Sequence, residues 1–211
     1  MSVVKIQNYT KKIKQNDILK NINFTFDNGK IYGLWGRNGS GKTMLLRAIS
    51  GLIYPTSGSI IIDDNVLHKD ISFPPNLGLL IENTTLLRQY DAFTNLKILS
   101  KINNKVADKD IIDSINLVGL DAEDRKKVGK FSLGMKQRLS IAQAIFEKPE
   151  LLLLDEPTNA IDEKGIVLIR DILQKQKDRG ATIIIASHNK EDLDVLADVK
   201  LKMNKGELCY E

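Results

Sequence analysis

Stretches of strand-like character lie near both ends of the chain. Four of them occur in the first part: Val3–Gln7, Ile22–Phe26, Ile31–Leu34 and Ser59–Ile62. Because Asp27-Asn28-Gly29 is a typical hairpin turn, the second and third of these strands are expected to pair with each other. The N-terminal part is therefore predicted to be an antiparallel β region. At the other end, Val199–Met203 and Gly206–Tyr210 are expected to form a hairpin around Asn204-Lys205-Gly206.

Two wholly apolar runs mark the second half of the chain, Leu151–Leu154 and Thr182–Ala186. Continuous apolar strands are typical of a parallel sheet whose two faces are both covered by helices. A helix of about Glu163–Lys177 is expected between them. The pattern therefore indicates an α/β fold with a mostly parallel sheet.

Residues 90 to about 147 have a different character, because apolar residues recur there at helical spacing. These positions are Phe93, Leu96 and Leu99, then Ile111, Ile112, Ile115, Leu117 and Val118, and the pattern breaks at Gly119. A further helix is expected from Ser132 to about Glu147. We therefore expect one domain, with residues 1–85 and 148–211 forming its core and about 86–147 a helical subdomain.

The composition is that of a globular protein with a sizeable core. The 211 residues are 42% apolar and 27% charged, and the net charge is +4. This mildly basic balance does not argue for nucleic acid, and no such partner is expected. The single cysteine, Cys209, cannot form an internal disulfide, which favours a reducing cytoplasm. The sequence shows neither a signal-peptide pattern nor a run of about 18 apolar residues, so a membrane role would need spans from another chain.

A glycine-rich loop follows the apolar run Ile31–Trp35 and precedes an expected helix from Lys42 to about Ser50. It matches the phosphate-binding template G-x-x-x-x-G-K-[ST] with Gly36, Arg37, Asn38, Gly39, Ser40, Gly41, Lys42 and Thr43. In such a loop, backbone N–H groups and the positive end of the helix face a phosphate. Lys42 is the candidate cation for the β- and γ-phosphates, and the Thr43 hydroxyl is a candidate Mg²⁺ ligand.

Two carboxylates, Asp155 and Glu156, end the strand Leu151–Leu154. Ligands of open α/β sheets bind beyond the carboxyl ends of the strands. Asp155 is therefore predicted to reach the Mg²⁺ shell that Thr43 holds, and Glu156 to orient the water that attacks the γ-phosphate. This division of roles predicts phosphoryl transfer.

A third candidate segment, Phe131-Ser132-Leu133-Gly134-Met135, lies at the start of the helix expected from Ser132. Ser132 is a favourable N-cap residue, and the bare amides of a helix N-terminus can bind an anion. Taken alone, an ordinary helix cap explains this segment. Its interpretation depends on the motifs around it.

In their order along the chain, these motifs resemble those of the ATP-binding cassette (ABC) ATPases, specifically the nucleotide-binding subunits of ABC transporters. Residues 131–135 look like the family signature, and Asp155-Glu156-Pro157-Thr158 like its Walker B segment. Asn159-Ala160-Ile161-Asp162 resembles the D-loop, which makes Asp162 a candidate site residue. His188 resembles the switch histidine of the family and is the second catalytic candidate beside Glu156.

The resemblance implies a P-loop NTPase core, ATP and Mg²⁺ as cofactors, and a reaction that one chain cannot complete. Two subunits, as a homodimer or a heterodimer, would enclose two ATP molecules head to tail. Ser132 and Gly134 of one subunit would then contact the γ-phosphate held by Lys42 of the other. ATP binding would close the dimer, and hydrolysis would let it open and drive a separate transmembrane permease subunit. The chain would be cytoplasmic, held on the inner face of the membrane by that permease.

Three positions depart from the family pattern. Ile13 stands where an aromatic residue usually stacks on adenine, so adenine stacking is expected to be weak. Met44 follows Thr43 where a second hydroxyl is common, which leaves the α-phosphate to backbone N–H groups. Glu82 replaces the glutamine of the Q-loop and is a candidate ligand of Mg²⁺ or of its water.

Two features of the sequence resemble those of the ATPases of bacitracin- and lantibiotic-type peptide export systems. One is the glutamate at position 82, and the other is the string Ser-Leu-Gly-Met-Lys-Gln-Arg that begins at Ser132. Within this string, Leu133 and Met135 replace a glycine and a glutamine of the usual signature. Ser132 and backbone amides are then left to contact the γ-phosphate. The resemblance favours export as the direction of transport.

Other functions stay open from the sequence. Asn189-Lys190-Glu191-Asp192 fits the guanine-reading pattern Asn-Lys-x-Asp of GTPases, although Asp155-Glu156-Pro157-Thr158 stands where GTPases have Asp-x-x-Gly. An ABC ATPase that acts on nucleic acid or the ribosome is a second alternative, although such proteins have long coiled coils or two cassettes. A module that binds nucleotide without hydrolysis is a third, and Glu156 argues against it.

Overall fold

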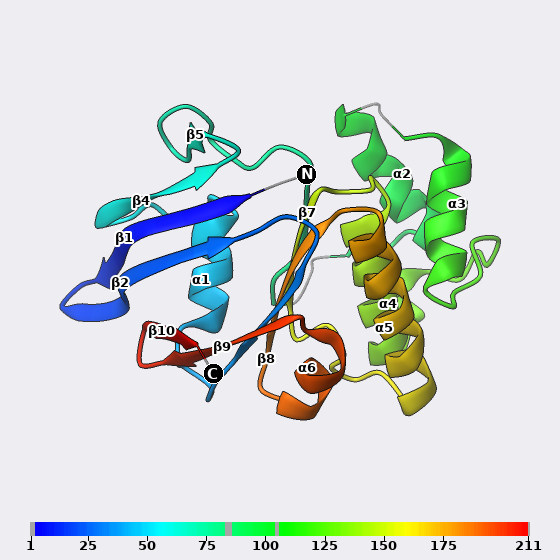
Figure 1. Cartoon of the computed structure of the whole chain (residues 1–211). Helices are drawn as coiled ribbons and strands as arrows, with labels where there is room; N and C mark the ends of the chain where they lie inside the picture. The colour runs from blue at the N-terminus through cyan, green and yellow to red at the C-terminus, as the bar shows by residue number, and fades with distance from the viewer. Residues whose placement is uncertain (1–2, 83–85, 104–105, 211) are drawn as a thin grey trace.

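The computed structural model describes residues 3–82, 86–103 and 106–210 (Figure 1). Its first part contains β1 (Val4–Ile13), β2 (Asn16–Phe26), β3 (Ile31–Trp35), α1 (Lys42–Ile49), β4 (Ser57–Ile62), β5 (Asn65–Val66) and β6 (Leu77–Leu80). A helical region follows, with α2 (Ala92–Asn103), α3 (Asp108–Leu117), the 3₁₀ turn η1 (Val128–Lys130) and α4 (Leu133–Ile145). The last part contains β7 (Leu151–Asp155), α5 (Glu163–Asp178), β8 (Thr182–Ser187), α6 (Lys190–Leu196), β9 (Val199–Asn204) and β10 (Glu207–Tyr210).

A six-stranded sheet forms the centre of the molecule, in the order β10-β9-β3-β8-β7-β6. Every neighbouring pair is parallel except β9 and β10, which form an antiparallel hairpin. The two apolar runs are β7 and β8, and β8 is buried at every position. The mostly parallel α/β sheet that these runs predict is confirmed, and so is the hairpin of the tail.

The hairpin predicted at Asp27-Asn28-Gly29 is wrong. β2 belongs to a separate antiparallel sheet, in the order β2-β1-β4-β5, whereas β3 lies between β9 and β8 in the central sheet. The partner of β2 is β1, and Ile13 pairs with Asn16 at the turn between them. Ile31–Leu34 are all buried, and such a strand suits the interior of a sheet with both faces covered. The four residues after β2 therefore carry the chain from one sheet to the other.

Two apolar cores lie on opposite faces of the central sheet, because successive side chains of a strand point to opposite faces. Leu151 and Leu153 of β7 pack in the core shared with α1 and the antiparallel sheet. Leu152 and Leu154 pack in the core shared with the helical region and α5. In Figure 1, α1 lies between the two sheets, and α2 to α5 gather on the other side of the central sheet.

The carboxyl ends of β3, β8 and β7 meet at one edge, because these strands are consecutive in the parallel part of the sheet. Trp35, Ser187 and Asp155 are their last residues. The loops that follow carry the candidate residues of all three strands to the same place. The limits of the helical subdomain stay a prediction. The part of the chain that the structure describes contains no helix whose length and apolar character would let it span a bilayer.

Candidate functional site

Glycines shape the loop between β3 and α1. Gly36, Gly39 and Gly41 have φ angles of 155°, 77° and 110°, which residues with a side chain rarely adopt. A Cβ atom at Gly36 would lie 2.3 Å from the Met203 carbonyl oxygen, so only glycine fits there. Gly41 is the N-cap of α1, so the free N–H groups of the first helical turn face the loop. The loop therefore has the form that the phosphate-binding template requires.

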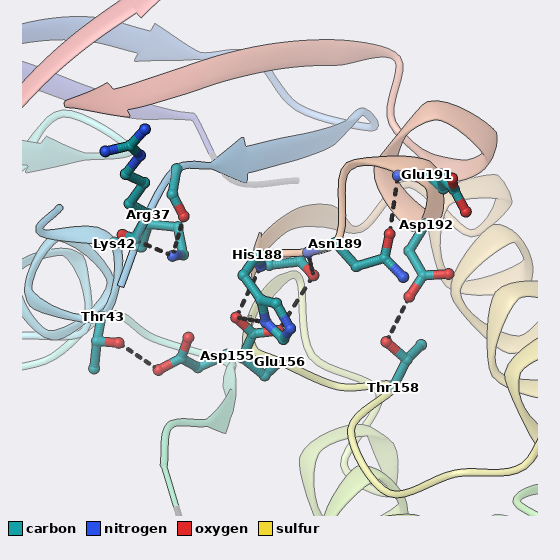
Figure 2. Close-up of polar contacts among 12 residues, drawn as sticks. Arg37, Lys42, Thr43, Asp155, Glu156, Thr158, His188, Asn189, Glu191 and Asp192 are labelled. Atoms are coloured by element: carbon teal, nitrogen blue, oxygen red, sulfur yellow. Dashed lines mark hydrogen bonds and ion pairs between the residues drawn. The ribbon is translucent and has the colours of Figure 1, made fainter. Parts of the chain in front are cut away.

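Lys42 is buried, and its Nζ donates a hydrogen bond to the Gly36 carbonyl oxygen at 2.7 Å (Figure 2). The loop thus curls around this amine. A cavity of about 330 Å³ adjoins it, lined by Ile18, Asn38, Gly39, Ser40, Gly41, Lys42, Thr43, Met44, Asp155 and Glu156. Gly36 and Arg37 line the next cavity, on the side of β9. Most residues of the glycine-rich loop therefore line the same cavity as Asp155 and Glu156, which come from a distant part of the chain.

Thr43 and Asp155 are in direct contact. The Thr43 hydroxyl donates a hydrogen bond to Asp155 Oδ2 at 2.6 Å, which joins the first turn of α1 to the end of β7. Burial raises the pKa of the Asp155 carboxyl, and the nearby Glu156 acts in the same direction, while the Thr43 hydrogen bond opposes both. Two of the three predicted metal ligands, Thr43 and Asp155, thus lie side by side, and burial disfavours the charge of Asp155.

Replacing Asp155 by asparagine is expected to stabilise the nucleotide-free protein. A folded-state pKa above the unfolded one means that stability falls as pH rises through that range, so the ionised carboxylate costs stability at neutral pH. Asparagine keeps an oxygen that accepts from Thr43 and carries no charge. We expect the Tm of the variant to lie above that of the wild type at pH 8, and the difference to shrink as pH falls through the range in which the Asp155 carboxyl takes up its proton. A wild type that melts above the variant at pH 8 would contradict this.

Glu156 and His188 are also in contact. His188 Nδ1 lies 2.8 Å from Glu156 Oε1, and the backbone N–H of His188 donates to the same oxygen at 2.9 Å (Figure 2). The Ser187 hydroxyl donates to the other carboxylate oxygen at 3.2 Å. The end of β8 therefore holds the Glu156 carboxylate beside the cavity that contains Lys42. The two predicted catalytic residues are brought together.

Gln137 supports the same loop and was not foreseen. Its Nε2 donates hydrogen bonds to the carbonyl oxygens of Glu156 and Pro157, at 3.1 and 3.2 Å. It lies on α4 and so connects the helix that follows the signature to the loop that carries Glu156. The local sequence does not distinguish Gln137 from a solvent-exposed helix residue, because its contact with the Glu156 loop exists only in the tertiary fold.

The signature residues begin α4 as predicted. Ser132 is the N-cap, and its hydroxyl accepts a hydrogen bond from the Met135 backbone N–H at 3.1 Å. Leu133 is 68% exposed. At Gly134 a Cβ atom would lie 2.8 Å from the Ala160 carbonyl oxygen, so the D-loop packs closely on the start of α4. Among the described residues that line the cavity at Lys42, none belongs to this segment.

Asp162 is the N-cap residue of α5, and its side chain is turned towards α4. Its Oδ1 accepts a hydrogen bond from Arg138 Nη2 at 2.7 Å. The Asp162 side chain is 67% exposed, so this ion pair is a surface contact. The D-loop and the signature helix thus form one connected surface, whereas a site role for Asp162 stays a prediction.

Glu82 and Ile13 do not line the cavity at Lys42, although the negative charge of Glu82 helps to raise the pKa of the Asp155 carboxyl. Glu82 Oε2 forms an ion pair with Arg47 Nη2 at 2.8 Å, at the far end of α1 from the P-loop. Ile13 ends β1 at the hairpin turn and is 44% exposed. Ile18 lines the cavity instead, at the position where β2 passes the loop. The roles of Glu82 in metal binding and of Ile13 in base binding stay predictions.

The residues of the guanine-reading pattern are used within the fold. Asn189 is the N-cap of α6 and accepts a hydrogen bond from the Glu191 backbone N–H at 3.0 Å. Asp192 is buried and accepts hydrogen bonds from Thr158 and Arg170. Because both Asp192 oxygens are occupied, its carboxylate is not presented to a base. The match to Asn-Lys-x-Asp is a property of the helix start.

Comparison with known proteins decides between the families. The family model described as ABC transporter matches residues 19–159, from β2 to the loop after β7. The chain belongs to the ABC transporter family. It is 65% identical over 206 residues to "Uncharacterized ABC transporter ATP-binding protein YybJ" of Bacillus subtilis (strain 168), covering 98% of this chain and 94% of that one. It is 38% identical over 210 residues to "Lantibiotic transport ATP-binding protein SrtF" of Streptococcus pyogenes, covering 99% and 90%.

A solved structure gives the same result for the fold of this ABC ATPase. "Dimeric Structure of MJ0796, a Bacterial ABC Transporter Cassette" superposes with a TM-score of 0.88 at 25% identity, covering 97% of this chain and 96% of that one. The predicted α/β fold is thus that of ABC cassettes. The family resemblance of the motifs is confirmed, and so is the ATPase class of the chain.

Proposed function

We propose that this ABC ATPase binds ATP with Mg²⁺, hydrolyses it and powers a transporter whose membrane subunit is a separate chain. The observation that carries the proposal is one cavity at which the buried Lys42, the Thr43–Asp155 pair and Glu156 meet. These residues fit the cofactors. The loop offers N–H donors and a cation to phosphates, and Thr43 and Asp155 offer oxygen atoms, which Mg²⁺ prefers.

The roles of the residues follow from their contacts. When bound, Mg²⁺ neutralises negative charge on the phosphates. Lys42 exchanges the Gly36 carbonyl oxygen for phosphate oxygens. Glu156 orients the attacking water and draws its proton, and His188 with Ser187 holds the Glu156 carboxylate in place through the contacts at 2.8 and 3.2 Å.

A second subunit completes the proposed site. Ser132 caps an exposed helix start that does not line the cavity at Lys42 in the same chain. Its hydroxyl and the bare amides of α4 are therefore available to the γ-phosphate held by another copy, or by a related chain in a heterodimer. The dimeric MJ0796 cassette is an assembly of two such subunits. ATP would then lie between two subunits and hold them together.

For the cargo we propose a peptide antibiotic of the lantibiotic or bacitracin type, exported from the cell. Support comes from the relative SrtF, which is named for lantibiotic transport, and from Glu82 and the string that begins at Ser132, which resemble those of such ATPases. The ATPase would lie on the cytoplasmic face of the membrane, held there by the membrane subunit.

The contact with the membrane subunit is proposed at an apolar depression beyond the C-terminal end of α1. A cavity of about 450 Å³ there is lined by Arg47, Leu52, Ile53, Leu79, Ile81, Glu82 and Gln143. A second cavity shares Leu52 and Leu79 with it and adds the exposed Phe73. Exposed apolar surface of this kind marks an interaction site. Arg47 and Glu82 line this cavity and form an ion pair, so a docked membrane subunit would contact Glu82 and could shift its side chain.

Replacing Leu52 by aspartate tests this contact. Leu52 is 53% exposed, so the change is expected to leave the fold and the ATPase activity of the isolated protein unaltered. We expect at least a ten-fold loss in the amount of membrane subunit that co-purifies, because a charge in an apolar contact must be desolvated. Val167→Asp, at an exposed apolar position on α5, is the matched control. The contact would be refuted if both variants retained as much membrane subunit as the wild type does.

The whole proposal is tested with the purified chain and with the membrane subunit that co-purifies with it. The chain alone is expected to hydrolyse ATP in preference to GTP, with no stimulation by RNA or DNA. Inverted membrane vesicles that contain both proteins are expected to accumulate a lantibiotic-type peptide only when ATP is present. Preference for GTP, or stimulation by nucleic acid without peptide uptake, would overturn the proposal in favour of the alternatives named above.

A further inference from the structure

A buried carboxylate ties together three segments beside the Glu156 loop. Asp192 on α6 is only 7% exposed. Its Oδ2 accepts a hydrogen bond from the Thr158 hydroxyl at 2.8 Å, which Figure 2 shows, and its Oδ1 accepts one from Arg170 Nη2 at 2.6 Å. We call Asp192, Thr158 and Arg170 the Asp192 clamp. Both oxygens of the buried Asp192 carboxylate thus have a hydrogen-bond partner. Loss of either partner would leave a buried charge without full compensation.

The clamp joins the two segments that carry the catalytic candidates. Thr158 follows Glu156 along the same loop, and Asp192 lies on the helix that follows His188. Arg170 comes from α5, the helix that the D-loop leads into. The direct contact between His188 and Glu156 is therefore backed by a second link between the same segments, on the side away from the P-loop cavity (Figure 2).

The Glu156 backbone needs such support. Its φ angle is 50°, in the left-handed region that a glutamate adopts only when its surroundings hold it there. The Glu156 N–H donates to the Ala186 carbonyl oxygen at 2.8 Å, and Gln137 binds the carbonyl oxygens of Glu156 and Pro157. Beyond Pro157, the Thr158 hydroxyl is the next polar group that fixes the loop, and it is fixed by Asp192.

We propose that Asp192 is a positioning residue for ATP hydrolysis. Through Thr158 it holds the loop from Glu156 to Asp162, so that the Glu156 carboxylate stays aimed at the water and the D-loop keeps one conformation. This inference rests on the proposed hydrolytic role of Glu156. Asp192 does not touch the cavity at Lys42, so it acts through the loop alone.

Thr158→Val is the sharpest test, because valine has nearly the shape of threonine and lacks only the hydroxyl. Misplacing a catalytic group by about 1 Å costs about 100-fold in rate, so we expect kcat to fall by about 10- to 100-fold. The KM for ATP and the affinity for nucleotide in the absence of turnover are expected to stay within two-fold, since Lys42 and Thr43 are untouched. Thr158→Ser restores the hydroxyl and is expected to recover most of kcat.

A matched control separates positioning from stability. The Asp198 carboxylate also accepts two hydrogen bonds, from Lys177 Nζ at 2.6 Å and from the Ile31 backbone N–H at 2.8 Å. Ile31 begins β3, so this contact lies at the end of β3 opposite to the phosphate-binding loop. Asp198→Asn and Asp192→Asn each remove one negative charge from a carboxylate with two partners, at an exposed position for Asp198 and at a buried one for Asp192. Both are expected to lower the Tm, whereas only Asp192→Asn is expected to lower kcat when activity is measured well below either Tm.

The outcomes are distinct. A kcat of Thr158→Val within two-fold of wild type would overturn the inference, and so would failure of Thr158→Ser to restore the rate. An equal fall in kcat for Asp198→Asn would show a general effect of stability and also overturn it. If wild type hydrolyses ATP and loses activity on replacement of Glu156, while Thr158→Val stays normal, only this inference fails. If replacement of Glu156 has no effect, the proposed function fails first.

Discussion

Replacing Glu156 by glutamine is expected to abolish ATP turnover and to leave ATP binding intact. Glutamine has the shape of glutamate and can still accept the hydrogen bond that the His188 backbone N–H donates to Glu156 Oε1. It cannot take a proton from water, and loss of a general base lowers a rate by about 100- to 10,000-fold. Lys42, Thr43 and Asp155 remain, so the affinity for ATP is expected to be unchanged or higher.

The same variant should accumulate an ATP-bound dimer. In the proposed arrangement, binding closes two subunits around ATP, and only hydrolysis lets them part. Size-exclusion chromatography with ATP is expected to show the dimer for Glu156→Gln and mostly monomer for the wild type. Glu123→Gln, which removes the same charge from an exposed loop, is the control and should behave like the wild type. Turnover of Glu156→Gln at the wild-type rate would remove Glu156 from its role.

The parts of the molecule that the sequence predicts well are those in which neighbouring residues carry the whole signal. The apolar run Leu151–Leu154 demands a strand buried on both faces, and the structure has β7 there. The glycines of the P-loop follow from the backbone that a phosphate requires, and all three of them have positive φ. Ser132 caps α4 because its own hydroxyl reaches the third amide of the helix. In each case local physics fixes the outcome.

The parts that the sequence does not predict depend on partners far along the chain. Asp27-Asn28-Gly29 is a good turn, but whether the next strand folds back or joins another sheet depends on which surface can bury Ile31–Leu34. Gln137 and Asp192 look like ordinary polar helix residues until the fold places them against the Glu156 loop. Glu82 is a similar case, since Arg47 of α1 holds its carboxylate in an ion pair.

Replacing Lys42 by alanine is expected to weaken nucleotide binding itself. Lys42 is buried, and it is the one lysine or arginine among the described residues that line the cavity proposed for the phosphates. A charge-assisted hydrogen bond contributes about 1.5–3 kcal/mol, which corresponds to about a 10- to 150-fold rise in the Kd for ATP. Alanine also leaves the Gly36 carbonyl oxygen without the hydrogen bond from Nζ, so a modest fall in Tm is expected as well.

Equilibrium titration with a fluorescent ATP analogue measures this Kd directly. Lys164→Ala removes the same charge from an exposed position on α5 and is the matched control. The two replacements in the site differ in a useful way: Lys42→Ala is expected to lose binding, and with it dimerisation and turnover, whereas Glu156→Gln loses turnover alone. Wild-type affinity in Lys42→Ala would mean that the triphosphate lies elsewhere. In that case the hydrogen bond between Thr43 and Asp155 would have only a structural role, because its proposed role in Mg²⁺ binding requires the triphosphate to lie in the same cavity.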